Sequence, residues 1–133
     1  MNVQLPSPRP FGVSSEEAIE LCREWMIYLG AADAVVASGM TRESCDIYSS
    51  GFLAWVDNSR GNLDIDVVEK AAGLAAADGR QPLIFLRGGV RPVARERADA
   101  LGVALLNYRE RDSSLDGRSR RGREVVATGL GGQ

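Results

Sequence analysis

The stretch CDIYSSGFLAWVDNS, residues 45–59, contains two short runs of strand-forming residues separated by the turn sequence SSG. This pattern is typical of a β-hairpin. A carboxylate, Asp46, stands at the start of the first strand, and a second, Asp57, stands near the end of the other. Because side chains alternate along a strand, Trp55 is expected on the same face as Asp57. The hairpin is therefore predicted to bring two carboxylates and a tryptophan together at one end of a sheet.

Helical and strand patterns alternate on both sides of this hairpin. Ser14 and Glu17 have the spacing of a capping box, and apolar residues then recur at helical spacing as far as Gly30. Strands separated by helices are expected to pair in parallel through right-handed crossovers, whereas the hairpin is antiparallel. This order, αβββαβαβ, predicts an α/β fold: a mixed sheet flanked by helices on both faces. The segments are a helix at 14–30, a strand at 33–38, the hairpin, a helix within 59–80, a strand at 82–87, a helix within 88–102 and a strand at 103–108.

At 133 residues, the chain is expected to form one domain with a single core. Residues 14–116 carry the patterned segments and are predicted to be that domain, after an N-terminal extension at residues 1–13. Residues 117–133 are polar and rich in arginine and glycine. We expect this last segment to be a flexible tail, because it offers little apolar surface to bury.

Composition excludes several classes of function. The chain has no histidine, which removes Ser-His and Cys-His catalysis and histidine-bound zinc. No apolar run approaches the roughly 20 residues needed to span a bilayer, and residues 1–12 lack the apolar core of a secretory signal. A cytoplasmic protein without a membrane partner is therefore expected. Cys22 and Cys45 are then expected to be buried small hydrophobic residues rather than reactive thiols.

A series of short segments carries a family resemblance. They are WMIYLG at 25–30, CDIYSS at 45–50, AWVDN at 54–58, DIDVVEKAAG at 64–73, PLIFLRGG at 82–89 and ARERADALGVALL at 94–106. In this order they resemble the Mrr-type branch of the restriction-endonuclease-like, or PD-(D/E)XK, superfamily. The resemblance covers roughly residues 14–116 and implies the restriction-endonuclease-like mixed sheet and an ancestry among Mg²⁺-dependent DNA nucleases.

The resemblance also implies an active site that is incomplete in this chain. In such nucleases an aspartate and a glutamine or glutamate hold Mg²⁺, while a lysine polarises the attacking water. Asp46 matches the aspartate, but Trp55 stands at the position of the glutamine or glutamate, and Asp57 at that of the lysine. Mg²⁺ requires oxygen ligands, which an indole does not offer. The site is therefore interpreted as degenerate, with no resident cofactor.

A divergent Mg²⁺-dependent DNA endonuclease is the alternative interpretation. In it, Asp46 and Asp57 form a two-carboxylate metal site, helped by Glu20 or Glu17 from the first helix. Lys70, the only lysine, is then the candidate for a catalytic lysine that has moved to the second helix. In the simpler structural interpretation, Asp46 caps a turn, Asp57 faces solvent near a strand end, and Lys70 belongs to a solvated helix face.

Two arginine-containing segments are candidates for contact with nucleic acid. RGGVRP, residues 87–92, precedes a helix N-terminus, where backbone N–H groups and the helix dipole can hold a phosphate. RSRRGR, residues 118–123, offers charges that would contact the backbone without sequence preference. The net charge of −2 argues against strong binding but permits a local basic patch. The predicted contact residues are Arg87, Arg91, Arg95, Arg118, Arg120, Arg121 and Arg123.

Three functions are compatible with these patterns. The favoured one is a catalytically degenerate nucleic-acid-binding or accessory module, with DNA as a weak and non-specific partner. The second is the divergent endonuclease. The third is an interaction module that self-associates, for example as a homodimer, through the sheet edge or the first helix.

Overall fold

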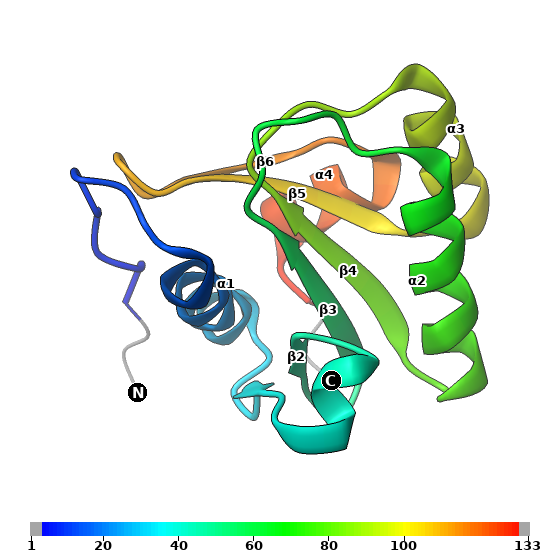
Figure 1. The fold of residues 1–133 in the computed structure, drawn as a ribbon, viewed down its shortest axis with the longest axis horizontal. Helices are drawn as coiled ribbons and strands as arrows, with labels where there is room; N and C mark the ends of the chain where they lie inside the picture. Colours follow the sequence, from blue (N-terminus) through cyan, green and yellow to red (C-terminus); the bar gives the residue numbers. More distant parts are fainter. Residues whose placement is uncertain (1–3, 131–133) are drawn as a thin grey trace.

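The computed structural model describes residues 4–130, and these form a six-stranded mixed sheet with helices on both faces (Figure 1). β3, β4 and β5 run in parallel, while the pairs β1–β2, β2–β3 and β5–β6 are antiparallel. The predicted α/β fold class is therefore confirmed. The strands lie side by side in chain order: β1 (Val35–Val36), β2 (Ile47–Tyr48), β3 (Phe52–Asp57), β4 (Gln81–Leu86), β5 (Ala104–Arg109) and β6 (Ser114–Gly117).

The helices divide the core into two layers. α2 and α3 cover one face of the sheet, and α1 and α4 cover the other (Figure 1). Alternation along β4 sends Phe85 toward α1 and α4 and Ile84 toward α2 and α3. No helix in residues 4–130 is long and apolar enough to cross a membrane. The helices are α1 (Ser15–Leu29), the 3-10 helix η1 (Gly39–Glu43), α2 (Ile65–Ala77), α3 (Pro92–Leu101) and α4 (Arg120–Thr128).

The first helix begins and ends where the sequence predicts. The Ser14 amide donates to Glu17 Oε1 at 2.7 Å, and the Glu17 amide donates to Ser14 Oγ at 3.2 Å, which completes the capping box. The pKa of Glu17 is lowered by its hydrogen bond to the Ser14 backbone. The helix stops at Gly30, whose φ of 123° disfavours a side chain.

The hairpin is shorter than its sequence suggests. β2 has two residues, paired as Ile47↔Ala54 and Tyr48↔Leu53, and β3 continues past them to pair with β4. The segment before the hairpin contains η1. η1 places Arg42 one turn before Asp46, and this proximity determines the surroundings of the Asp46 carboxylate.

The expectation of a flexible tail after residue 116 is wrong for the part that the structure describes. β6 pairs with β5, and α4 packs on β5 and β6. Val125 and Leu130 are buried in the same core layer as α1, and the Leu130 amide donates to the Leu29 carbonyl at 2.8 Å. Residues 131–133, also part of the expected tail, lie outside the described residues.

Close backbone packing explains why this segment looks polar in the sequence. A Cβ on Gly122 would collide with the Leu105 carbonyl, so glycine lets α4 lie directly against β5. The buried Ser119 hydroxyl caps α4, donates to the Val103 carbonyl at 2.8 Å and accepts from the Leu105 amide at 3.0 Å. A glycine and a serine thus form the contact between α4 and β5, where large apolar residues would be usual.

Truncation after Asp116 is expected to destabilise the domain instead of merely removing charge. Burial of a Val or Leu side chain stabilises a fold by about 1.5–3 kcal/mol, and the truncation removes both Val125 and Leu130. We expect the free energy of unfolding, measured by urea denaturation, to fall by at least about 3 kcal/mol. An unchanged urea midpoint would show that α4 is not part of the core.

Candidate functional site

The carboxylate of Asp46 is already engaged on both oxygens. Oδ1 accepts from Arg42 Nε at 3.0 Å, and Oδ2 accepts from the Val56 amide at 2.7 Å. The hydrogen bond to Asp46 raises the pKa of Arg42. Asp46 therefore fastens the start of β2 to β3 and has an arginine as its counter-ion. A metal ion at this carboxylate would have to displace Arg42.

Trp55 lies beside Asp46. Its Nε1 donates to the Ser44 carbonyl at 2.7 Å, which holds the half-buried indole against the loop before the hairpin. A hollow of about 350 Å³ lies there, between the hairpin and α2. Asp46, Trp55 and Lys70 all line it, together with Glu43 and Asp66. Of the residues singled out for catalysis in the sequence, the structure thus brings Asp46 and Lys70 to one hollow.

The other carboxylates proposed for a metal site are used elsewhere. Asp57 Oδ1 accepts from the Ser59 amide at 3.0 Å, in the turn that ends β3. Glu20 accepts two hydrogen bonds from Arg23, and these lower its pKa. Glu17 caps α1. None of these three lines the hollow beside Trp55. The residues present therefore do not fit Mg²⁺ held as in the resembled nucleases.

The two cysteines are buried, as expected. Burial raises the pKa of both Cys22 and Cys45, which disfavours the thiolate form that nucleophilic or metal-binding chemistry needs. Cys22 packs on the buried face of α1, and Cys45 packs at the start of the hairpin.

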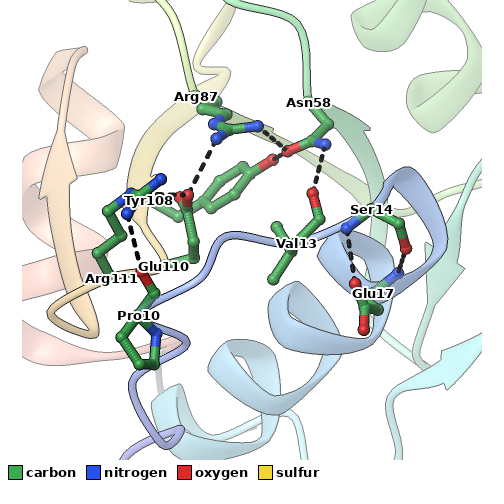
Figure 2. Close-up of polar contacts among 9 residues, drawn as sticks. All are labelled: Pro10, Val13, Ser14, Glu17, Asn58, Arg87, Tyr108, Glu110 and Arg111. Carbon is green, nitrogen blue, oxygen red and sulfur yellow. Dashed lines mark hydrogen bonds and ion pairs between the residues drawn. The ribbon is translucent and has the colours of Figure 1, made fainter.

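A polar cluster at the carboxyl ends of β3, β4 and β5 was not expected from the sequence (Figure 2). Arg87 Nη2 donates to Glu110 Oε2 at 3.0 Å, with the two side chains 17% and 5% exposed. Asn58 Oδ1 accepts from the Tyr108 hydroxyl and from Arg87 Nη1. Burial raises the pKa of Tyr108, so its hydroxyl remains a donor. Arg87, predicted to contact nucleic acid, is instead committed largely to Glu110.

The segment before α1 packs against this cluster. The Arg9 amide donates to the Glu110 carbonyl at 2.6 Å, and Arg111 Nη1 donates to the Pro10 carbonyl at 2.8 Å. Asn58 Nδ2 reaches the Val13 carbonyl at 3.4 Å (Figure 2). The described part of the N-terminal extension is thus attached to the domain at the same edge of the sheet. A sequence signal did exist, because Asn58, Arg87 and Glu110 each directly follow a parallel strand, and the ends of parallel strands meet at one edge of a sheet.

The predicted nucleic-acid-binding arginines separate into two groups. Arg91 lies 3.7 Å from Asp64, Arg121 lies 3.4 Å from Glu124, and Arg87 pairs with Glu110. Arg120 is exposed, and its backbone amide donates to Asp99. The remaining three converge on a hollow of about 200 Å³, which we call the arginine hollow: Arg95 on α3, Arg118 after β6 and Arg123 on α4.

The arginine hollow has positive charge without compensation. Within residues 4–130, no carboxylate oxygen lies within 4.0 Å of the guanidinium nitrogens of Arg95, Arg118 or Arg123. Val90 and Gly117 complete the lining. A Cβ on Gly117 would collide with the backbone of Arg123, so glycine lets α4 approach the end of β6. The fold brings Arg95 of α3 beside Arg118 and Arg123, which are close together in the sequence.

Comparison of the chain with family models, curated proteins and solved structures found no match.

Glu110→Gln is expected to destabilise the domain by about 3–5 kcal/mol, because it leaves the poorly exposed Arg87 charge without its partner. The matched control is Glu69→Gln, which breaks the exposed pair between Glu69 and Arg97 and is expected to cost about 0–1 kcal/mol. Urea denaturation measures both. Equal costs for the two variants would show that the cluster is not a stabilising centre.

Proposed function

We propose that the chain is a non-catalytic nucleic-acid-binding domain that holds the phosphate backbone at the arginine hollow. The observation that carries the proposal is the convergence of Arg95, Arg118 and Arg123 on one hollow with no carboxylate partner in residues 4–130. Guanidinium groups bind phosphate oxygens through paired, charge-assisted hydrogen bonds. Three of them around 200 Å³ form a site of a size suited to phosphate groups.

Binding of this kind is expected to be weak and indifferent to base sequence. The chain carries a net charge of −2, so attraction is local to the arginine hollow. Contacts to phosphate fix the position of a nucleic acid but do not read its bases. Non-specific binding by such contacts typically has a Kd of about 10⁻⁴ to 10⁻⁶ M at physiological salt.

The geometry beside the hairpin supports the non-catalytic part of the proposal. Asp46 is neutralised by Arg42, and Trp55 occupies the position from which the resembled nucleases supply a second oxygen ligand. Asp57, at the position of their lysine, brings negative charge where the scissile phosphate would need positive charge. A restriction-endonuclease-like domain with these residues is suited to binding and not to cleavage.

Replacing Arg95, Arg118 and Arg123 together by Gln is expected to weaken binding to duplex and single-stranded oligonucleotides by more than tenfold at low salt. Each lost phosphate contact also lowers the slope of log Kd against log salt by about 0.7–0.9. Fluorescence anisotropy across a salt series measures both quantities.

The matched control replaces three paired arginines, Arg23, Arg80 and Arg97, and therefore changes the net charge equally. It is expected to retain most of the affinity and the salt slope. Equal losses in the two triple variants would show that net charge and not the arginine hollow determines binding. Absence of binding by the unaltered protein at low salt would remove the proposal.

A divergent Mg²⁺-dependent endonuclease is the second candidate function. The observation in its favour is that Asp46 and Lys70 line the same hollow. In this reading Lys70 replaces the missing strand lysine, and Arg42 has to move away from Asp46.

Self-association as a homodimer and a cytoplasmic location stay predictions.

The two candidate functions differ in a cleavage assay. We expect no nicking of supercoiled plasmid DNA in Mg²⁺ or Mn²⁺, since Asp46 is paired and Trp55 offers no oxygen ligand. Nicking that is lost in both Asp46→Asn and Lys70→Gln, but kept in Glu69→Gln, would favour the endonuclease.

A further inference from the structure

A second basic hollow, of about 350 Å³, lies at the carboxyl ends of the parallel strands. We call it the carboxyl-end hollow. Its lining includes four arginines and two carboxylates: Arg60, Arg87, Arg109, Arg111, Glu110 and Asp112. We propose that it binds a phosphate monoester, the dianionic group of a nucleotide or of a phosphorylated nucleic-acid end. This proposal does not depend on backbone binding at the arginine hollow, with which it shares no lining residue.

Hydrogen bonds and an ion pair hold the side chains at the floor of the carboxyl-end hollow. The buried Glu110 holds Arg87 in place, and Tyr108 and Asn58 complete the hydrogen-bonded network around them (Figure 2). Glu110 itself is fixed through its backbone carbonyl, which accepts from the Arg9 amide. A charged group that is held in this way can present its remaining N–H donors to a ligand without a large entropic cost.

The rim of the carboxyl-end hollow is held by close backbone packing. A Cβ on Gly88 would collide with the backbone of Arg60 and Gly61, so the glycine seats the loop after β3 against the loop after β4. The buried Asn107 donates to the Gly88 carbonyl at 2.9 Å and fixes the second loop in turn. The loop that bears Arg60 is therefore positioned by the sheet.

The charge balance favours an anion. Four arginines and two carboxylates line the hollow, but Arg87 pairs with Glu110, and Arg109 pairs at 2.9 Å with Asp116, which lies outside the lining. Arg111 Nε lies 4.0 Å from Glu110 with its side chain mostly exposed, and Arg60 has no carboxylate within 4.0 Å in residues 4–130. A monoester carries up to two negative charges near neutral pH and three acceptor oxygens, which match arginine forks.

Placement in the fold points to the same conclusion. Because β3, β4 and β5 run in parallel, the segments that follow them meet at one edge of the sheet, and Arg60, Arg87 and Arg109 line the hollow from there. The arginine hollow is lined instead by residues of α3, α4, the end of β6 and Val90, and it shares none of them with the carboxyl-end hollow. The two hollows therefore suit different phosphates: an internal diester in one and a terminal monoester in the other.

The test is calorimetric titration of the full chain with thymidine 5′-monophosphate, with thymidine as the control ligand. In parallel, anisotropy compares a 5′-phosphorylated oligonucleotide with its 5′-hydroxyl form. Preference for the monophosphate in either arm, lost at least tenfold in Arg60→Gln/Arg111→Gln and retained in Arg118→Gln/Arg123→Gln, supports the proposal. The arm that responds identifies a free nucleotide or a nucleic-acid end as the source.

Equal binding of phosphorylated and unphosphorylated probes in both arms overturns the proposal. A preference that is lost in Arg118→Gln/Arg123→Gln but kept in Arg60→Gln/Arg111→Gln overturns it as well, and assigns the monoester to the arginine hollow. Arg60→Gln alone serves as the second variant if loss of the bond from Arg111 to Pro10 disturbs the fold. Thermal unfolding of each variant checks that it is folded.

Discussion

Parallel pairing of β3, β4 and β5 is the constraint on which the rest of the structure depends. Each of these strands is covered on both faces, so its side chains alternate between the two core layers. Parallel direction also brings three carboxyl ends to one edge, and Asn58, Arg87 and Glu110 meet there although they belong to separate segments. The polar cluster is therefore a product of strand direction and not of any local motif.

Features that depend only on residues of one segment could be predicted from the sequence. Ser14 and Glu17 cap a helix wherever they stand three residues apart before an apolar stripe, and they do so here. The run PLIFLR has too many large apolar residues for a one-sided strand, and the structure buries it on both faces. Burial of Cys22 and Cys45 likewise followed from residue type. Each of these depends on the segment itself.

Features that depend on contacts between segments far apart in the sequence could not be predicted. The final helix was missed because its contact with β5 uses Gly122 and Ser119, which resemble loop residues until the Leu105 backbone is placed beside them. The arginines were identified by composition, but whether each is paired depends on carboxylates that the fold brings near, as with Arg87 and Glu110. Asp57, expected to join Asp46 in a metal site, instead accepts a hydrogen bond from the nearby Ser59 amide in a local turn.

The late position of α4 in the chain has a consequence for biosynthesis. The layer that contains α1 is completed by Val125 and Leu130, which are translated more than ninety residues after α1 ends. Until they leave the ribosome, apolar side chains on that face of β5 and β6, including Leu106 and Leu115, have no cover from α4. Transiently exposed apolar surface of this kind promotes aggregation. The nascent chain is therefore vulnerable until α4 has left the ribosome, and chaperone binding is most useful before that point.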